Sequence, residues 1–298
     1  MPATPHVLVR EWLDHLERDG KSPHTVAGYA RALRHFARWS RQTYGQSFNP
    51  ALIIPRDVHD WIAHQQTVKQ AKPATINQRL VALSRFYQWA MAKGHVRSDP
   101  TAEIKGVRRD QRQPKALDKG DVRRLLRHVH AGGNARDAAI VELLLGAGLR
   151  VEELLALDRG SVTLGERSGL VVVRKGKNQA YREVPLTAPV RRALRKYLEL
   201  YPNLKEDDPL WVGQRGPLKD RSGIWRMLKK YARQARVDEE QVSAHVLRHT
   251  FARRYLDANP DDLRHLAALL GHASIETTMI YTEPTTEDLA ERMEKAEQ

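Results

Sequence analysis

Six side chains in the second half of the sequence are of the types needed for chemistry on a phosphate group: Arg150, Lys175, His245, Arg248, His272 and Tyr281. Two arginines suit planar, bidentate recognition of phosphate oxygens. A lysine can protonate a leaving alkoxide, and two histidines can move protons near neutral pH. A tyrosine can attack phosphorus, but its ordinary pKa of about 10 means that it needs a cationic pocket or a base. The set predicts phosphoryl transfer through a covalent phosphotyrosine.

The sequence gives no sign of a metal ion or a nucleotide cofactor. It contains no Walker loop, no carboxylate cluster suited to Mg²⁺ and no cysteine. His245 and His249 stand four residues apart, but no glutamate follows the first histidine and no third ligand is apparent. We therefore expect His249 to be a buried, hydrogen-bonded neighbour. A phosphotyrosine retains the energy of the broken DNA bond, so rejoining would need neither metal nor ATP.

Composition indicates a nucleic-acid partner. The net charge is +14 over 298 residues, which suits a polyanion, although a generally basic protein surface is the alternative. The length allows two domains. No apolar run is long enough to span a membrane, and the first residues lack the pattern of a signal peptide. We expect a cytoplasmic, nucleoid-associated protein without a membrane partner.

The elements that must position these residues are mostly helices. In the N-terminal third, apolar spacing predicts helices over residues 8–16, from 23 to 40, from 55 onward and over 75–93. Arginines lie outside the apolar face of the second helix, either as a solvated basic face or as phosphate contacts: Arg31, Arg34, Arg38 and Arg41. A basic stretch follows, either a flexible tether or a segment along a duplex, with Arg108, Arg109 and Arg112.

The remaining two-thirds reads as helices interrupted by one β-hairpin. The hairpin is expected over residues 169–174 and 181–186, with Lys175 at the end of its first strand. Arg150 and Glu153 share a helix face, so an ordinary surface ion pair is one interpretation of them. His245 and Arg248 share another face. A further helix begins near residue 262 and ends at Gly271.

The motifs together resemble the tyrosine recombinases, or phage-type integrases, and among them the compact Xer-like members. The resemblance covers nearly the whole chain. Four segments carry it in the family's order: residues 148–154 (GLRVEEL), 174–177 (RKGK) with 184–186 (VPL), 245–252 (HVLRHTFA), and 270–274 (LGHAS) with 277–281 (TTMIY). Residues 22–36 and 75–100 resemble the family's helical core-binding domain.

The resemblance implies a role for each residue. Tyr281 would attack the scissile phosphate, giving a 3′-phosphotyrosyl bond and a free 5′-hydroxyl. Arg150 and Arg248 would hold the non-bridging oxygens. The other assignments are Lys175 as the proton donor to the 5′-oxygen, His245 as the proton acceptor for the tyrosine, His272 as a hydrogen-bond donor to the phosphate, and Glu153 as a residue that orients its neighbours.

The family also implies a fold and an assembly. We expect a mainly α chain with a small β-sheet in the catalytic domain (α+β), forming a two-domain, C-shaped DNA clamp. The expected domains are residues 1–105 (core-binding, SAM-like), 106–116 (basic linker) and 117–298 (catalytic domain with a C-terminal tail). A homo-tetramer would hold two DNA sites and exchange strands through a Holliday junction, with or without a second recombinase or an accessory protein.

Two rival interpretations stay open at this point. A type IB topoisomerase has a similar set of catalytic residues, and a helix-turn-helix regulator would explain part of residues 266–281. Within the recombinases, integration, plasmid or transposon resolution and resolution of chromosome dimers are all alternatives.

Overall fold

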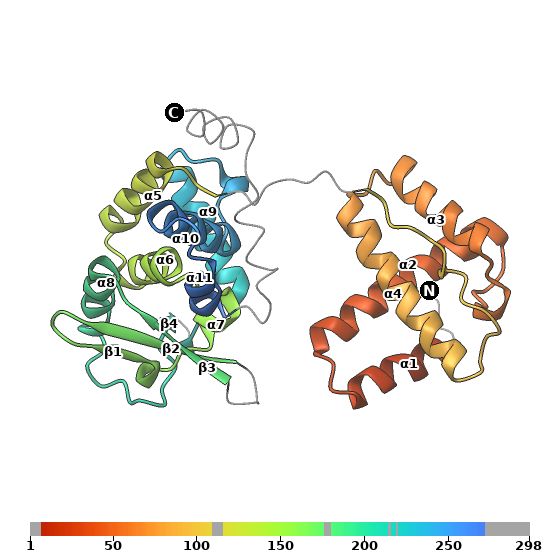
Figure 1. The fold of residues 1–298 in the computed structure, drawn as a ribbon, viewed down its shortest axis with the longest axis horizontal. Coiled ribbons are helices and arrows are strands. Elements are labelled where there is room, and N and C mark those ends of the chain that lie inside the picture. Colours follow the sequence, from red (N-terminus) through yellow and green to blue (C-terminus); the bar gives the residue numbers. More distant parts are fainter. Residues whose placement is uncertain (1–6, 109–115, 176–179, 214–215, 219, 272–298) are drawn as a thin grey trace. The chain divides into compact units, whose positions relative to one another are not determined.

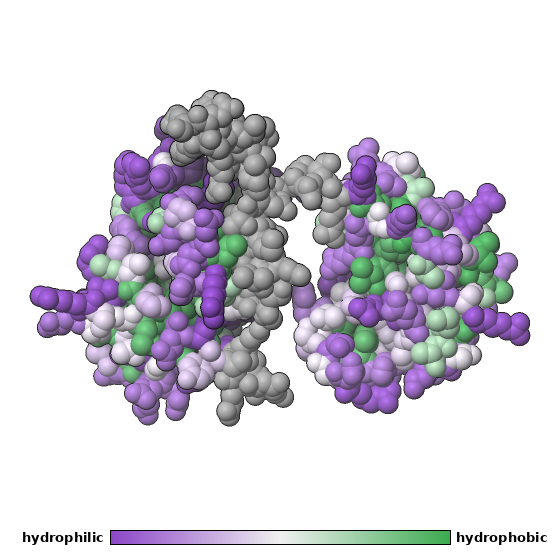
Figure 2. Space-filling model, in the orientation of Figure 1, coloured by the Kyte–Doolittle hydropathy of each residue, from purple (hydrophilic) through white to green (hydrophobic). Residues whose placement is uncertain are grey.

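The computed structural model describes residues 7–108, 116–175, 180–213, 216–218 and 220–271, and the side chains of Lys175 and Ala180 are not among what it describes. The chain divides into two compact units, Met1–Gln111 and Arg112–Gln298 (Figure 1). Hydrophilic residues predominate on the face of each unit that Figure 2 shows. No helix among the described residues is long and apolar enough to cross a membrane.

The first unit consists of four helices: α1 (Val7–Arg18), α2 (Pro23–Tyr44), α3 (Pro55–Thr67) and α4 (Pro73–Ala92), with a short 3-10 turn, η1 (Pro50–Leu52), before α3. The Ser22 hydroxyl accepts a hydrogen bond from the Thr25 backbone N–H, and Pro23 occupies the first helical turn of α2. This capping explains why α2 begins where the sequence predicted. Gly45, with φ of 70°, ends it.

Aromatic side chains fill the core of this unit. The ring of Phe36 packs edge-on against Trp61, with ring centroids 5.0 Å apart, and against Phe48 at 5.5 Å. Trp12 of α1 meets Phe86 of α4 in the same way at 5.6 Å. Such contacts join α2 to α3 and α1 to α4. α2 also packs directly against α4, and it carries the arginines discussed below.

The second unit is built around α6 (Ala135–Ala147), nearly all of whose residues are buried. It packs against α5 (Lys119–Ala131), α8 (Ala188–Leu198) and α10 (Ala244–Ala258). The other described helices are α7 (Val151–Leu155), α9 (Arg221–Gln234) and α11 (Leu263–Leu270), with 3-10 turns η2 (Arg159–Ser161) and η4 (Glu239–Gln241). The apolar composition of α6 follows from this central position.

A three-stranded antiparallel sheet lies at one side of this unit, in the order β1 (Val162–Leu164), β2 (Gly169–Lys175) and β3 (Ala180–Pro185) (Figure 1). The register pairs Val171 with Val184, Val173 with Arg182, and Lys175 with Ala180. The hairpin was predicted from the sequence, but β1 was not. A second, two-stranded ladder, β4 (Val212–Gly213) with β5 (Gly216–Pro217), was also not predicted.

Candidate active site

The turn between α6 and α7 presents Arg150. Gly148 ends α6 with φ of 60°, and a Cβ at this position would lie 2.4 Å from the Phe251 ring. Only glycine fits such a conformation in so little space. Arg150 then caps α7, and its backbone N–H donates to Oε2 of Glu153 at 2.8 Å. The local sequence thus sets both residues at the start of one helix.

Glu153 is the common partner of three arginines. Nη1 of Arg150 donates to its Oε1 at 3.0 Å, and Arg182 binds both of its oxygens at 3.0 and 2.8 Å. Nη1 of Arg248 lies 3.8 Å from Oε2. The Glu153 side chain is only 12% exposed. The Arg150–Glu153 pair is therefore part of a partly buried cluster rather than an isolated surface ion pair.

The arginines around Glu153 lower the pKa of its carboxyl group. Burial alone would raise the pKa of the carboxyl group, but the hydrogen bonds from Arg182 and from the Arg150 backbone, with the charges of both guanidinium groups, outweigh it and lower the pKa to about 2. Glu153 is consequently an anion at neutral pH. A fixed anion can orient the surrounding guanidinium groups.

The two arginines predicted to bind phosphate differ in exposure. The Arg248 side chain on α10 is 4% exposed; its Nη1 donates to the Gly148 carbonyl at 2.6 Å and its Nη2 to the Leu270 carbonyl at 2.8 Å. The Arg150 side chain is 40% exposed, and its Nη1 also reaches the Leu270 carbonyl, at 3.4 Å. The structure thus brings Arg150 and Arg248 together at the end of α11.

His245 stands beside this pair on α10. Its Nε2 lies 2.7 Å from Nε2 of His249, so one ring donates a hydrogen bond to the other. Burial, together with the positive charges of Arg248 and Arg150, lowers the pKa of His245 below its usual 6.5. The imidazole is therefore neutral at pH 7. His249 is buried and hydrogen-bonded, as the sequence predicted.

Arg182 was not predicted, although it belongs to the same cluster. It lies on β3 opposite the buried Val173, and its side chain is 12% exposed. Its Nε donates to the Leu269 carbonyl at 2.8 Å, in addition to the two bonds with Glu153. The only signal in the sequence was its place on the inward-facing positions of the hairpin.

For the other predicted catalytic residues, only the position along the chain is known. Lys175 is the last residue of β2, and its side chain lies outside what the structure describes. His272 and Tyr281 lie outside the described residues, and His272 directly follows Gly271. Over the described part of the chain, no group of three or more His, Asp or Glu side chains could hold a metal ion.

Comparison with known proteins gives the family. The model of the phage integrase family matches residues 115–288, and that of the phage integrase N-terminal SAM-like domain matches residues 9–94. The chain belongs to the phage integrase family. Tyrosine recombinase XerC of Neisseria gonorrhoeae is 34% identical over 292 residues, covering 96% of this chain and 93% of that protein. Tyrosine recombinase XerA of Thermococcus kodakarensis is 33% identical over 295 residues, covering 98% and 96%.

Solved structures of recombinases have the same fold. A XerA recombinase is similar over 98% of both chains, with 28% identity and a TM-score of 0.55. A XerH recombinase bound to a palindromic difH substrate has 22% identity and a TM-score of 0.75 over 92% of this chain and 80% of that one. The predicted family, mainly helical fold and tyrosine site-specific recombinase activity are thus confirmed. The similarities give no support to a topoisomerase or a regulator.

The first unit of this recombinase has a basic groove between α2 and α4, with a volume of about 520 Å³. Arg31, Arg34 and Arg38 line it, together with Arg79 and His35. Nη1 of Arg79 lies 3.3 Å from Nε2 of His35 and donates to Oε1 of the buried Gln65 at 2.8 Å. Burial, followed by the charge of Arg79, lowers the pKa of His35 to about 4, so it is neutral at pH 7.

The remaining arginines predicted to contact DNA are less informative. Arg41 is exposed near the end of α2 and does not line the groove. Arg108 is also exposed, and the residue before it, Val107, is hydrogen-bonded to α4. The Asn77 side chain of α4 accepts a hydrogen bond from the Val107 backbone N–H at 2.8 Å and donates one to the Val107 carbonyl at 2.9 Å. Arg109 and Arg112 lie outside the described residues.

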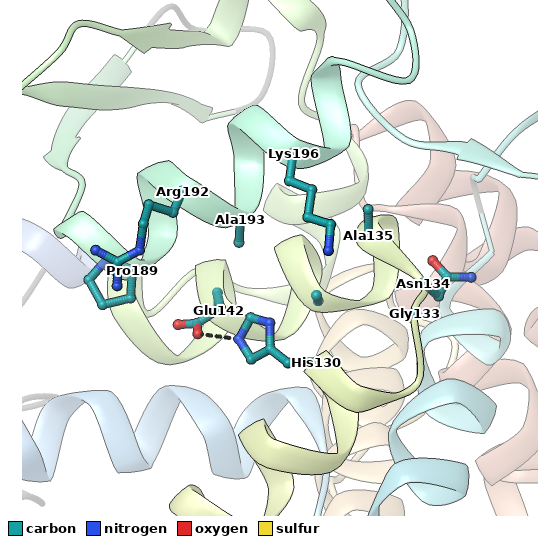
Figure 3. Close-up of a pocket in the computed structure, with 10 residues that line it drawn as sticks. His130, Gly133, Asn134, Ala135, Glu142, Pro189, Arg192, Ala193 and Lys196 are labelled. Carbon is teal, nitrogen blue, oxygen red and sulfur yellow. Dashed lines mark hydrogen bonds and ion pairs between the residues drawn. The ribbon is translucent and has the colours of Figure 1, made fainter.

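A smaller hollow of about 220 Å³ lies between α5, α6 and α8 of the recombinase (Figure 3). Glu142, the charge that interrupts the apolar sequence of α6, is buried there and pairs with His130 at 2.9 Å. Arg192 and Lys196 of α8 line the same hollow. None of its lining residues belongs to the arginine cluster, so it is separate from the candidate active site.

Proposed function

We propose that this recombinase cuts and rejoins double-stranded DNA at a specific site through a 3′-phosphotyrosyl bond to Tyr281. One observation carries the proposal: Arg150 and Arg248 meet around the partly buried Glu153, with His245 one helical turn from Arg248, at the point where α11 ends and the chain continues to His272 and Tyr281. This is the grouping that phosphoryl transfer to a tyrosine requires.

The arginines would bind the non-bridging oxygens of the scissile phosphate. Arg150 has the more exposed guanidinium group and Arg248 the more rigidly bound one. Glu153 fixes Arg150 through two hydrogen bonds, one to the backbone and one to the side chain. Donors that are oriented before the reaction stabilise the charge that develops on the phosphate in the transition state.

Proton transfer would use the remaining groups. As the phenol oxygen of Tyr281 forms its bond to phosphorus, its proton would pass to neutral His245. In the tautomer in which Nε2 of His245 carries the ring hydrogen and donates it to Nε2 of His249, the accepting atom would be Nδ1. The bond from phosphorus to the 5′-oxygen breaks, and Lys175 would protonate that oxygen. His272 would donate a hydrogen bond to the phosphate. Rejoining is the reverse of these steps and needs no metal or ATP.

The first unit would provide DNA binding. The proposed core-binding domain spans residues 1–105, the linker 106–116 and the catalytic domain 117–298, with the two domains gripping one duplex. The basic groove supports phosphate contacts by Arg31, Arg34 and Arg38, and we extend the DNA-contacting set to Arg41, Arg108, Arg109 and Arg112. XerH in the solved structure is bound to its difH substrate.

The working assembly would be a tetramer. Four copies would hold two sites, exchange strands through a Holliday junction and act on the nucleoid in the cytoplasm, alone or with a second recombinase or accessory protein. The acidic segment 285–297, which lies outside the described residues, would dock on a neighbouring copy.

The proposed function is tested in two stages. Duplexes that the protein binds are selected from a random pool or the native genome. A selected duplex is then nicked beside the cleavage point, so that the short fragment with the freed 5′-hydroxyl diffuses away. A covalent protein–DNA band is the expected result. Binding without a covalent band at any selected site would contradict the proposal and favour a regulator.

The second stage separates recombination from simple relaxation. A plasmid with two copies of the selected site should give recombinant products and a protein–DNA complex of tetramer mass. Relaxation of a plasmid that has one site, without recombination of two, would favour a topoisomerase instead.

A further inference from the structure

We propose that Arg182 is a positioning residue for DNA cleavage: it joins strand β3, Glu153 and the last turn of α11, so that the arginines and the end of α11, from which the chain continues to Tyr281, keep one relative geometry. The proposal rests on the proposed function of this site. It concerns a residue that acts through others, because Arg182 uses its own donors within the protein.

Each of the three guanidinium nitrogens of Arg182 donates a hydrogen bond within the protein. Nη1 and Nη2 bind the two oxygens of Glu153 at 3.0 and 2.8 Å, and Nε binds the Leu269 carbonyl at 2.8 Å. Its side chain is 12% exposed. A planar fork that binds a carboxylate with both arms fixes the orientation of that carboxylate, which a lysine in the same place cannot do.

Glu153 passes this orientation to the proposed phosphate-binding residues. Each of its oxygens is shared: Oε1 accepts from Arg182 and from Nη1 of Arg150, while Oε2 accepts from Arg182 and from the Arg150 backbone N–H. Arg248 lies 3.8 Å from Oε2. A rotation of the carboxylate would therefore displace Arg150 and change the field around Arg248.

The other end of the connection is the C-terminal turn of α11. Its carbonyl groups point their partial negative charge at three arginines, since Leu269 accepts from Arg182 and Leu270 accepts from Arg248 and Arg150. Gly271, with φ of 64°, lies so close that a Cβ there would be 2.8 Å from Nη1 of Arg182. Arg182 thus fixes the residue from which the chain departs toward Tyr281.

A structural ion pair elsewhere in the same unit provides a matched control. Nε and Nη2 of Arg136 bind Oδ1 of Asp137 at 3.1 and 2.9 Å, and its Nη1 binds the Val212 carbonyl at 3.1 Å. The chemistry is that of Arg182, with a side chain 24% exposed. Arg136 is at the start of α6, whereas Gly148 follows its end, about 20 Å along the helix axis.

The test compares Arg182→Met, Arg182→Lys and Arg136→Met. We would measure the single-turnover rate of covalent adduct formation at saturating protein on a nicked duplex selected for binding, with the dissociation constant for the intact duplex and the melting temperature. Since a misplacement of about 1 Å can slow a reaction roughly 100-fold, Arg182→Met should lower the rate on this scale while DNA affinity changes less than about threefold.

The other two variants decide between positioning and general stability. Arg136→Met should lower the melting temperature but leave the cleavage rate within about threefold of the wild type. Arg182→Lys keeps the charge without the fork and should cleave more slowly than the wild type by at least about tenfold. If Arg182→Met does not fold, the cleavage rate of Arg182→Lys alone tests whether Arg182 is a positioning residue.

Two results would overturn the inference. One is a cleavage rate in both Arg182 variants equal to that of the wild type. The other is an equal loss of rate in Arg136→Met and Arg182→Met, which would assign Arg182 to stability alone. If instead the wild-type protein forms no adduct on any selected duplex, the proposed function itself fails.

Discussion

At the scale of single residues, the candidate site is an arrangement of cations around one partly buried anion. Glu153 carries hydrogen bonds from Arg150 and Arg182 and lies near Arg248. Three guanidinium groups at such short range would repel one another without it. The carboxylate permits a dense positive cluster in a folded protein, and that cluster is what a scissile phosphate requires.

The depressed pKa of Glu153 predicts a pH-dependent contribution to stability. Since the pKa falls from 4.5 to about 2, the ionised form stabilises the fold by roughly 3 kcal/mol, at about 1.36 kcal/mol per pKa unit. This contribution is complete above about pH 4.5 and is lost as the pH falls toward 2. Urea denaturation should show Glu153→Gln less stable by roughly this amount at neutral pH.

The difference in the free energy of unfolding between Glu153→Gln and the wild type should then decrease steadily as the pH is lowered from about 4.5 toward 2. Glu183→Gln is the control, because Glu183 is exposed on the same strand as Arg182. A difference that stays constant between neutral and acidic pH would contradict the environment described for Glu153.

The lowered pKa of His245 predicts how the rate of DNA cleavage falls at acidic pH. Burial and the charges of Arg248 and Arg150 favour the neutral ring, so His245 can accept the tyrosine proton until the pH falls below 6.5. Single-turnover cleavage rates measured against pH should fall with a midpoint below 6.5. A midpoint above 6.5 would show that a different group accepts the proton.

Sequence spacing predicted part of this site. Arg150 with Glu153, and His245 with Arg248 and His249, lie within one helical turn of each other, so their proximity follows from helix geometry. Arg182 reaches Glu153 across 29 residues of sequence. That contact depends on how the hairpin packs against α7 and α11, which no local spacing determines. The structure brings some of these residues together, but the catalytic roles of all six stay predictions, including those of Lys175, His272 and Tyr281.

At the scale of elements, the end of α11 connects the arginine cluster to the segment that contains Tyr281. Gly271 adopts a left-handed conformation there and touches Arg182. We expect Gly271→Ala to cost roughly 1 to 2 kcal/mol in backbone strain and also to slow cleavage, because the added methyl group displaces Arg182.

Gly94→Ala separates these two effects. Gly94 has φ of 74° after α4, but a Cβ there meets nothing within 4 Å. In thermal denaturation, Gly94→Ala should lose about as much stability as Gly271→Ala. Its rate of cleavage of a nicked duplex should equal that of the wild type. Equal rates in the two variants would exclude a role for the contact between Gly271 and Arg182.

Helix periodicity predicted the helices of the first unit and α11 to within a few residues. Ser22-Pro23 began α2, and Gly148 and Gly271 ended α6 and α11, as their types indicate. The missed strands were β1, with three residues, and β4 and β5, with two each. Such short strands show no alternation, since their existence depends on pairing with distant neighbours.

At the scale of the whole molecule, the two units have separate hydrophobic cores and an excess of positive charge. The basic groove of the first unit predicts a salt-dependent affinity. If Arg31, Arg34 and Arg38 each neutralise a phosphate, changing all three to Gln should reduce the slope of log affinity against log salt by roughly 2 to 3. Fluorescence anisotropy over a salt series measures this slope.

The control removes the same charge elsewhere in the first unit, at Arg10, Arg18 and Arg56, which are exposed and do not line the groove. This triple variant should keep a slope within about one unit of the wild type. Equal slopes for the two triple variants would mean that net charge, rather than the groove, determines DNA affinity.

The proposed covalent bond between Tyr281 and DNA at the arginine cluster can be tested by identifying the joined atoms. The protein is trapped on a nicked selected duplex and digested, and the peptide that carries the nucleotide is sequenced by mass spectrometry. We predict that a 3′-phosphate is linked to Tyr281, that the released strand has a 5′-hydroxyl, and that Tyr281→Phe binds the duplex without forming an adduct. A nucleotide on any other residue, a 5′-linkage, or an adduct formed by Tyr281→Phe would contradict the account.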